Sequence, residues 1–572
     1  MSLTNDARKG FHDETVNYLE WLKQNNYDIS DKVAIHDYTS VKQGRGVIAL
    51  ANIDKDEIIA TIPKSALLNV TQNSLVAKYP ELKYGLLHLN HWEALIIILL
   101  YELQNREQSK WKSYLNVLPT SNFDQLMFWS SNELNQLQPS CILERVGKDQ
   151  ADKMFDRIMK IIHKLGITDL EGVTSEQYNV VATLIMSYSF DVEITEQEEE
   201  KLEEFAAKER RNQPRTAVDE DKEEKENESE FEESTGEKET TENGDDNAEV
   251  SANANASAAE QQEQQEEIID RDIEDLKDIE ERQEIAIIID GYLKSMVPFA
   301  DTLNADTNYN NAIVTDANEN LVIKAIEPIQ KGEQIYNTYS EHPNSEILRR
   351  YGYVELQGSK HDFGEIPLSI IKQFFLEKYN VEEDYLESLL RLIAEISLQE
   401  QSDEHSEDGV FEVVIDSYDC FRSGEVIVEL IFLIQLLTTF LMLNETVDFY
   451  SVRRIYLKCY QLIESKKVTK DFMTNFDAIF EVRMDQYPNY AAEPFNRDIS
   501  NLSRELMAEV VLKSEYQSLK ACREDVTTTL EKTLGEKIKI IADDKFLRAL
   551  QKKRPATDAE EEKNKKKQVR KR

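Results

Sequence analysis

Apolar residues recur at helical spacing in several separate segments of the chain. Near the start, Tyr18, Leu19 and Leu22 fall on one face and predict a short helix over residues 17–26. Longer apolar runs predict mostly buried helices over residues 91–104 (HWEALIIILLYELQ), 111–118 and 177–190 (QYNVVATLIMSYSF). Beyond residue 353 the pattern is largely that of amphipathic helices, expected over residues 368–380, 383–397, 426–443 and 452–464.

The hydrophobic period changes between residues 41 and 68. Short β-branched runs lie on either side of residues 54–56, which predicts a hairpin of two strands. A similar pattern returns in IQKGEQI, residues 329–335. The spacing of Ile53, Lys55, Glu57 and Ile59 is repeated by Ile329, Lys331, Glu333 and Ile335. The middle of each pattern is a polar turn, with Asp56 in one and Gly332 in the other. The sequence therefore predicts two hairpins of like design on either side of the middle of the chain.

The longest apolar run, residues 426–443 (VIVELIFLIQLLTTFLML), has borderline length for a membrane span. Four polar residues interrupt it: Glu429, Gln435, Thr438 and Thr439. These interruptions favour a buried core helix, so we expect a soluble protein without membrane contact.

These patterns together predict an α+β fold in four parts. The parts are an N-terminal helix (1–32), a β-rich domain with a large helical excursion (33–354), an all-helical domain (355–545) and a basic tail (546–572).

The net charge of −43 is concentrated in one segment of the chain. Residues 196–284 contain 35 Asp and Glu against 11 Lys and Arg. The segment is nearly free of aromatic and β-branched apolar residues, so it cannot bury enough surface to offset its chain entropy. We expect a disordered acidic insertion within an otherwise mildly acidic globular protein.

The cysteines and the two ends of the chain indicate an intracellular protein. Cys141, Cys420, Cys459 and Cys522 form no CxxC pair, which favours reduced thiols over disulfides or a zinc site. The N-terminus has no apolar segment typical of secretion. The tail carries two basic clusters, KKRP and KNKKKQVRKR, which resemble a bipartite nuclear-import signal. A nuclear location follows as the expectation, with a cytoplasmic pool also allowed. The alternative is a solvated basic tail or a nonspecific RNA contact.

Three segments carry candidate chemistry. The GxG of residues 43–46 precedes a predicted strand, where glycine lets the backbone approach a ligand, although a simple turn explains it equally well. A Rossmann phosphate loop is disfavoured because no GxGxxG precedes a helix. Pro298, Asp301 and Asn304 form a more specific pattern, and Tyr339 and Tyr351 follow. Taken singly, these residues also suit turns, caps or aromatic core. Their occurrence in this order favours a site that holds a charged cofactor against a lysine amine.

These segments resemble the ordered motifs of SET-domain protein lysine methyltransferases. The resemblance rests on GRGVIA, SYSF, PFADTLNAD, GEQIYNTY and NSEILRRYGYVE. The most similar branch contains the plant Rubisco large-subunit methyltransferase, animal nuclear relatives and fungal ribosomal-protein methyltransferases. The resemblance covers most of the chain outside residues 196–284 and the tail. It implies that residues 33–354 form the catalytic SET domain and that residues 355–545 form a helical domain that binds the protein substrate.

The resemblance also implies the cofactor and the site residues. The cofactor is S-adenosylmethionine, and no metal is implied. The implied cofactor contacts are Gln43, Gly44, Arg45, Tyr188, Asn304, Ala305, Tyr339 and Tyr351. Tyr339 takes the position of the catalytic tyrosine that faces the substrate amine. Ser189 and Asp301 fall where the family lines the lysine channel, largely with backbone carbonyls.

Two positions depart from the family pattern. Ala305 stands where the wider family usually has His, which removes a side chain but leaves the backbone contacts. Tyr188 stands where the plant enzyme has Arg, so the kind of contact made there can differ.

The implied chemistry explains why such residues are needed. Only a neutral amine can accept a methyl group, yet the pKa of free lysine is about 10.4. A narrow apolar channel and a nearby positive sulfonium both disfavour the ammonium form and lower that pKa. Tyr339 would orient the amine and, with carbonyl oxygens, contact the methyl group through weak CH···O bonds. No general base is obligatory.

The resemblance implies a basic protein of the large (60S) ribosomal subunit as substrate, monomethylated by a monomeric enzyme. No direct contact with nucleic acid is expected, because no arginine-rich segment with interleaved aromatics is seen in the sequence. Two alternatives remain. In the first, the substrate is a nuclear or chromatin protein. In the second, the chain is a noncatalytic acidic escort for basic proteins.

The acidic insertion has two interpretations that one deletion separates. It either steers basic substrates by long-range attraction or is a solvated loop, tolerated because long loops add little closure entropy. Its composition favours the loop, so we expect deletion of residues 196–284 to leave catalytic efficiency unchanged at low salt. A loss of efficiency that disappears at high salt would establish steering instead.

Overall fold

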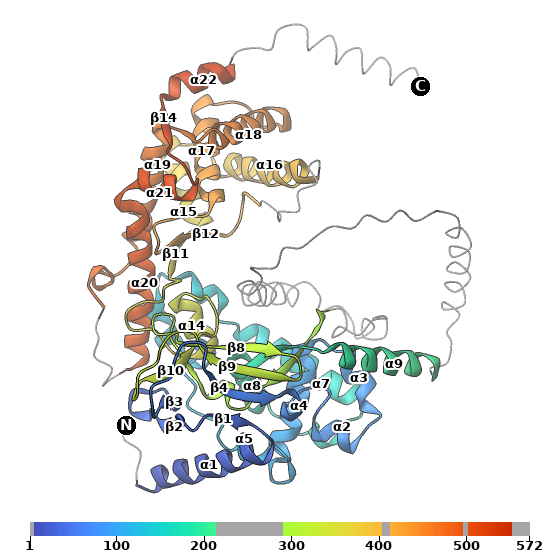
Figure 1. Cartoon of the computed structure of the whole chain (residues 1–572). Helices are drawn as coiled ribbons and strands as arrows, with labels where there is room; N and C mark the ends of the chain where they lie inside the picture. Colours follow the sequence, from blue (N-terminus) through green and yellow to red (C-terminus); the bar gives the residue numbers. More distant parts are fainter. Residues whose placement is uncertain (1–4, 213–289, 403–411, 496–501, 552–572) are drawn as a thin grey trace, which may run out of the picture. The chain divides into compact units, whose positions relative to one another are not determined.

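The computed structural model describes residues 5–212, 290–402, 412–495 and 502–551 (Figure 1). Contacts within the chain separate two compact units. The first comprises residues 1–127, 147–341 and 350–352, and the second comprises residues 128–146, 342–349 and 353–572. The sequence predicts a single boundary near residue 355, whereas the structure also assigns the two short segments 128–146 and 342–349 to the second unit.

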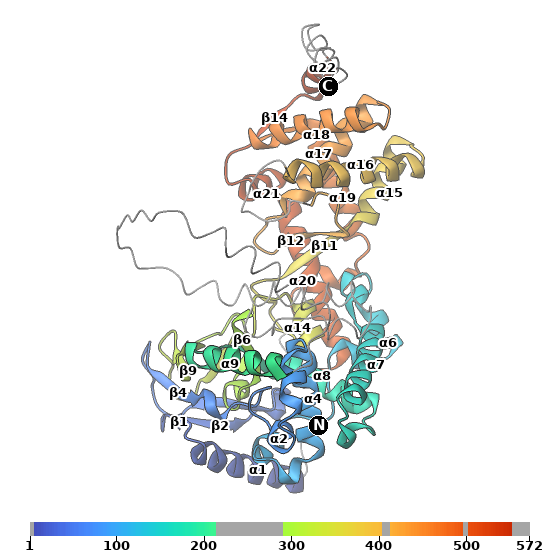
Figure 2. The same cartoon turned by 90° about the vertical axis from the view of Figure 1, so that its right-hand side faces the viewer.

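The helices of the first unit form where apolar runs predict them. α4 (His91–Gln104) and α8 (Ser175–Tyr188) match their predicted ranges and pack side by side (Figures 1 and 2). α4 begins at a capping box, in which the side chains of Asn90 and Glu93 each accept the other's backbone N–H. The other helices are α2 (Ser74–Lys78), α3 (Leu82–Leu87), α5 (Lys112–Leu115) and α7 (Lys148–Lys164).

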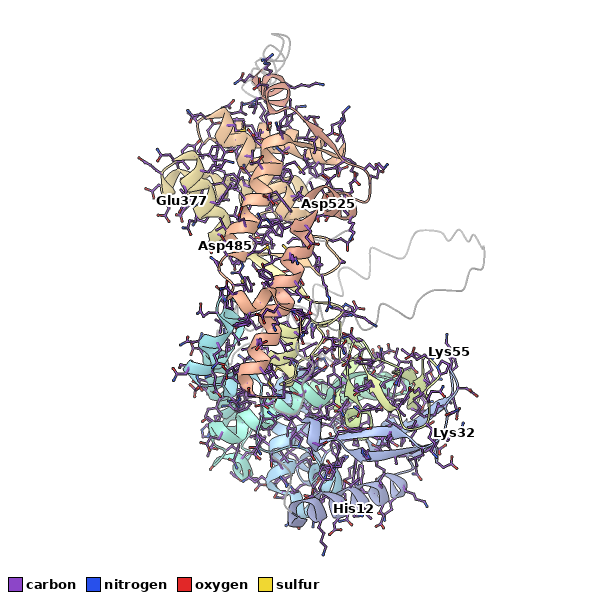
Figure 3. All side chains as sticks on the ribbon, turned by 90° about the vertical axis from the view of Figure 1, so that its left-hand side faces the viewer. His12, Lys32, Lys55, Glu377, Asp485 and Asp525 are labelled. Atoms are coloured by element: carbon purple, nitrogen blue, oxygen red, sulfur yellow. The ribbon has the colours of Figure 1, made fainter. Side chains whose placement is uncertain are left out.

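Helix α1 (Asn5–Gln24) begins well before its predicted start at residue 17. Its C-terminal half buries Tyr18 and Leu22, whereas its N-terminal half is mostly exposed, with His12 on the outer face (Figure 3). An apolar stripe detects only the half that packs against the core. The indole N–H of Trp21 donates to the Lys110 carbonyl (2.7 Å), which fixes α1 beside α5.

Two four-stranded sheets lie at the centre of the first unit. Their strand orders are β1-β4-β9-β8 and β2-β3-β10-β7. The first sheet consists of β1 (Asp28–Ile29), β4 (Ile58–Pro63), β8 (Ala312–Ala317) and β9 (Asn320–Ala325). The second consists of β2 (Val33–Asp37), β3 (Arg45–Ala49), β7 (Asn304–Ala305) and β10 (Gln334–Asn337).

The prediction of two hairpins was wrong, although the strands themselves form as expected. β3 pairs with β10 and β4 pairs with β9, so the strands on either side of each turn lie in different sheets. The two links lie against each other, because Ile53 and Ile329 exchange both backbone hydrogen bonds (2.9 Å each). Asp56 and Gly332 both adopt positive φ in these links (66° and 92°). The repeated pattern thus marks two crossovers between sheets, and a local pattern cannot choose a strand's partner.

The segment expected to be a disordered insertion begins with ordered structure. β5 (Ser189–Glu193) pairs antiparallel with β6 (Tyr292–Met296), and α9 (Glu196–Asn212) follows β5. Residues 196–212 are therefore helical, which corrects the expectation for them. Leu202 is buried and Phe205 packs against the core. The overall composition of residues 196–284 gives no indication of this apolar pair. Residues 213–284 lie outside the described residues, so the deletion proposed above is better bounded at 213–289.

The second unit is mostly helical. Its long helices are α15 (Leu368–Tyr379), α16 (Glu383–Ser402), α17 (Val428–Leu443), α18 (Phe449–Glu464), α19 (Lys470–Met484) and α20 (Arg504–Glu524). Shorter ones are α6 (Ser131–Leu134), α21 (Val526–Thr533) and α22 (Asp543–Gln551), and α14 (Asn344–Tyr351) spans residues assigned to both units.

The expectation of an all-helical domain was wrong in one respect. β11 (Phe363–Pro367) pairs with β12 (Ser417–Phe421), and β13 (Lys467–Thr469) pairs with β14 (Lys539–Ile541). Each pair is a small two-stranded sheet joining segments distant in sequence, and such short strands leave little periodic signal.

An ion pair to a buried carboxylate and several hydrogen bonds hold residues 128–146 within the second unit. Arg145 donates to both oxygens of Glu365 (3.1 and 2.7 Å). Arg483 on α19 is 2% exposed and donates to the carbonyls of Glu365 (2.8 Å) and Pro139 (3.1 Å). These partners lie more than a hundred residues apart, so no local pattern marks the segment as part of the second unit.

Helix α17 is a core helix, as its polar interruptions predict. Thr439 accepts a hydrogen bond from Gln435, and Thr438 accepts one from Asn475 of α19 (3.0 and 2.7 Å). Three of the four interruptions are thus buried polar groups with partners. Within the described ranges, no helix is long and apolar enough to cross a membrane.

Candidate active site

Strand β10 brings the three predicted motifs together. It pairs antiparallel with β3, placing Gln334 opposite Ile48, and parallel with β7, placing Tyr336 opposite Asn304. The GxG segment, the PFADTLNAD segment and the YNTY segment therefore become neighbours in one sheet. Residues separated by about three hundred positions meet through backbone pairing alone.

Asn304 and Gly46 fit against each other. The Asn304 side-chain amide donates to the Arg45 carbonyl (3.3 Å). A Cβ at position 46 would lie 2.6 Å from that amide nitrogen and 2.8 Å from the Tyr38 ring, so only glycine fits there. Gly44 adopts a φ of 63°, which favours glycine for a different reason. The second glycine of the GxG therefore lets the backbone of β3 approach the Asn304 side chain closely.

The side chains of Gln43 and Arg45 are occupied by the protein itself. Gln43 accepts a hydrogen bond from Gln334 of β10 (3.1 Å). Arg45 donates to Thr15 (3.0 Å), and its guanidinium stacks over the Phe11 ring of α1 (3.9 Å). Any ligand contact at Arg45 would therefore be made by backbone, as expected for this segment.

Tyr339 follows β10 and is oriented by a carbonyl from the neighbouring motif. Its hydroxyl donates to the Leu303 carbonyl (2.9 Å). Burial raises the pKa of Tyr339 well above its ordinary value, and the nearby Tyr188, Tyr351 and Asp301 raise it further. The hydroxyl therefore stays neutral. Its proton is directed to the Leu303 carbonyl.

Tyr351 lies against Tyr339, with ring centroids 4.9 Å apart. Ser187 of α8 donates to the Arg350 carbonyl (3.0 Å), and Gln125 donates to Ser187 (3.1 Å). These bonds fix the backbone next to Tyr351. Neither Ser187 nor Gln125 was among the predicted site residues, and no local signal marks them.

The predicted residues Tyr188 and Ser189 lie at the junction of α8 and β5. The Ser189 hydroxyl donates to the Ile185 carbonyl (2.6 Å), and Ser189 is paired with Met296 of β6. Burial raises the pKa of Tyr188 to about 12, with a further contribution from Asp301. Tyr188 also contributes to the raised pKa of Tyr339, so the junction of α8 and β5 lies within the electrostatic influence of Tyr339.

Asp301 is buried, and its carboxylate accepts a hydrogen bond from the Tyr114 hydroxyl of α5 (2.6 Å). Burial raises the pKa of Asp301 to about 7, although hydrogen bonds from Tyr114 and Thr302 act to lower it. The preceding Phe299 has φ 75° and ψ −45°, close to the rare γ-turn geometry and strained for a bulky residue. The Phe299 N–H donates to the Tyr18 hydroxyl of α1 (2.6 Å). Two tyrosines thus hold this turn in place.

Ala305 keeps its backbone position while offering no polar side chain. It is buried on β7 and pairs with Asn337 of β10. Asn311 was not predicted, yet its amide donates to the Gln334 carbonyl (3.0 Å) and accepts the Tyr336 N–H (2.9 Å). Its side chain therefore helps to fix the register of β10.

Tyr18 and Tyr114 are the other supporting residues that sequence reasoning missed. Each lies in a run that reads as ordinary apolar helix, and only their neighbours in space identify them. Throughout the described residues, no group of three or more His, Cys, Asp or Glu side chains is arranged to hold a metal ion.

Comparison with known proteins identifies the family of the chain. The SET domain family model matches residues 44–340. The chain is 32% identical to ribosomal lysine N-methyltransferase 4 of Saccharomyces cerevisiae, covering 94% of this chain and 95% of that protein. It is 29% identical to the Schizosaccharomyces pombe protein of the same name, covering 66% and 74%.

Solved structures show the same fold at low sequence identity. Rubisco LSMT bound to AdoMet matches with a TM-score of 0.52 and 15% identity over 96% of this chain and 99% of that one. The SET domain of LSMT bound to lysine and AdoHcy matches with a TM-score of 0.52 and 15% identity, covering 91% and 93%. The predicted α+β fold class is thereby confirmed.

The close fit at Gly46 can be tested by adding one methyl group. We expect Gly46→Ala to displace Asn304 or Tyr38, to destabilise the protein by about 1–3 kcal/mol, and to weaken binding of S-adenosylhomocysteine at least about tenfold. Thermal unfolding and calorimetric titration measure these effects. Gly10→Ala is the matched control, since nothing lies within 4 Å of its added Cβ and alanine suits a helix. Unchanged ligand binding by Gly46→Ala would contradict the role assigned to this contact.

Proposed function

The chain belongs to the SET-domain family of S-adenosylmethionine-dependent lysine N-methyltransferases, and we propose that it monomethylates a lysine of a basic protein of the large ribosomal subunit. The observation that carries this proposal is the likeness to a named ribosomal lysine methyltransferase over 94% of the chain. That likeness includes the second unit as well as the SET domain. The enzyme acts as a monomer in this proposal.

The residues around β10 suit the cofactor. Asn304 is held against the Arg45 carbonyl, and the missing Cβ of Gly46 lets the two segments approach each other closely. We assign cofactor contacts to the backbone of Gln43, Gly44, Arg45 and Ala305 and to the side chains of Tyr188, Asn304, Tyr339 and Tyr351. When bound, S-adenosylmethionine supplies an activated methyl group on a positive sulfonium. The absence of a histidine at position 305 leaves those backbone contacts intact.

Tyr339 is the proposed catalytic residue. Its proton is directed to the Leu303 carbonyl, so its oxygen accepts from the substrate amine and fixes the direction of the nitrogen lone pair. The backbone at Ser189 and Asp301 lines the lysine channel in this assignment. With S-adenosylmethionine bound, the nearby positive sulfonium and the buried surroundings together disfavour an ammonium ion, which lowers the pKa of the entering lysine.

The proposed location is the nucleus, with a cytoplasmic pool. Its support is the pair of basic clusters in residues 552–572, which lie outside the described residues. The same tail keeps a nuclear or chromatin protein as the second candidate substrate.

The role of Tyr339 can be tested by removing only its hydroxyl. We expect Tyr339→Phe to lower the methylation rate by about a hundredfold, because one oriented polar contact at the reacting amine is lost. Binding of S-adenosylhomocysteine should stay within about threefold of wild type, measured by calorimetric titration. Tyr450→Phe is the matched control, since Tyr450 is 79% exposed on α18 and should retain full activity. Wild-type turnover by Tyr339→Phe would refute the catalytic assignment.

The substrate can be identified by comparing cells with and without the gene. Intact-mass spectrometry of ribosomal proteins should show one large-subunit protein lighter by a single methyl group in the deletion strain. Reintroducing the wild-type gene should restore the methyl group, and the Tyr339→Phe gene should not. Loss of methylation from a histone or another nuclear protein, with ribosomal proteins unchanged, would support the second candidate instead.

A further inference from the structure

The carboxylate of Asp301 has an unusual environment for a buried acid. The residue is 8% exposed, and Tyr114 and Thr302 donate hydrogen bonds to it. Within the described part of the chain it has these donors but no ion-pair partner. Arg45, which also packs against α1, pairs instead with Glu14 (3.2 Å). A buried carboxylate without a cation is costly to keep ionised.

Five tyrosines from separate segments lie within the electrostatic influence of this carboxylate, and one of them, Tyr114, contacts it directly (2.6 Å). Burial raises the pKa of each one, and the Asp301 charge raises it further: Tyr18 of α1, Tyr27 before β1, Tyr114 of α5, Tyr188 at the end of α8 and Tyr339 after β10. All five are neutral polar groups, and the Tyr27 hydroxyl has no hydrogen-bond partner among the described residues. These tyrosines therefore supply no positive charge to balance the Asp301 carboxylate.

Asp301 is also close to the proposed cofactor contacts along the chain. It lies two residues before Leu303, whose carbonyl accepts the Tyr339 hydroxyl, and three before Asn304. Its charge also acts on Tyr188 and Tyr339, which are proposed to face the cofactor and the amine. A sulfonium ligand carries a positive charge that could balance the Asp301 carboxylate.

We propose that the ionised Asp301 carboxylate is the counter-charge of the site, which favours a positive sulfonium ligand over the neutral thioether left after methyl transfer. This inference rests on the proposed function. It assigns a role to the side chain of Asp301, in addition to the backbone position in the lysine channel. Tyr114 is a positioning residue in this arrangement, because its hydroxyl orients the carboxylate.

Ligand charge and proton binding are then linked. A sulfonium favours the ionised carboxylate, so its binding releases a proton from the fraction of Asp301 that is protonated. The free carboxyl has a pKa of about 7, raised chiefly by burial. Sulfonium affinity should therefore be full above that pH and should fall as the pH drops below it. A neutral thioether should show no such dependence on Asp301. The same preference assists release of the product after transfer.

The test compares two ligands that differ only in the methyl group and its charge. The full-length protein is titrated calorimetrically with S-adenosylmethionine and with S-adenosylhomocysteine from about pH 6 to about pH 8. Ionisable groups shared by the ligands cancel in the ratio of their dissociation constants. In the wild type, the preference for S-adenosylmethionine should rise about tenfold across this range, as expected for one interacting charge.

Two variants and one control separate the role of Asp301 from general effects on the fold. Asp301→Asn should bind S-adenosylhomocysteine normally and show a ratio independent of pH. Tyr114→Phe removes a hydrogen bond that lowers the pKa of Asp301, so the midpoint of the ratio should move to higher pH. Asp362→Asn is the matched control. Asp362 is likewise buried, with a pKa raised to about 6 by burial, but lies in the second unit, so the ratio should stay as in wild type.

The outcomes are distinguishable. A ratio that does not change with pH in the wild type, or a pH dependence that persists in Asp301→Asn, would overturn the inference while leaving the methyltransferase assignment standing. If Asp301→Asn binds neither ligand, the Tyr114→Phe midpoint decides, and an unshifted midpoint overturns the inference. Failure of the wild type to bind either ligand would overturn the proposed function and this inference with it.

Discussion

The backbone pairing of β10 is the constraint on which the site depends. This four-residue strand lies between β3 and β7, and its register sets which residues of the three motifs are neighbours. A shift by one residue would turn its side chains to the opposite face and separate Asn304 from the Arg45 carbonyl. Asn311 resists such a shift, since its side chain bonds both the N–H of Tyr336 and the carbonyl of Gln334.

Tyrosine suits the surroundings of this strand because it combines a large apolar ring with one polar atom. The rings of Tyr18 and Tyr114 fill the space between α1, α5 and the sheets, and their hydroxyls reach the Phe299–Asp301 turn. Their hydroxyls offset part of the cost of a strained backbone and a buried acid. A lysine or arginine in the same place would neutralise Asp301 permanently. Neutral donors leave that charge available to a ligand.

The second unit also contains a buried carboxylate, but there its partner is a charged residue. Arg145 pairs with the buried carboxylate of Glu365, whose backbone carbonyl accepts a hydrogen bond from the buried Arg483. Such pairs add specificity to a segment that leaves one part of the chain and packs in another, since removing one partner would strand the other charge. Asp301, in contrast, has hydrogen-bond donors but no cationic partner within the described residues.

Local information in the sequence was sufficient for the long apolar helices and for the strands that flank the repeated turn pattern. Helices α4, α8, α15 and α17 were predicted within a few residues because each is long and has an apolar pattern that packing reinforces. The strands β3, β4, β9 and β10 were also found, and the motif residues Asn304, Asp301, Tyr339 and Tyr351 were recognised from their order along the chain.

Tertiary structure alone decided which strands pair and which residues support the motifs. The links around Asp56 and Gly332 have the same local pattern as hairpins, but hydrogen bonding to distant strands makes them crossovers. Tyr18, Tyr114, Gln125 and Asn311 carry no local signal, because their roles depend on a partner more than twenty residues away. A sequence pattern shows the neighbours of a residue along the chain and indicates which faces of an element are buried. The neighbours that hold Asp301 and orient Tyr339 are set by packing in three dimensions.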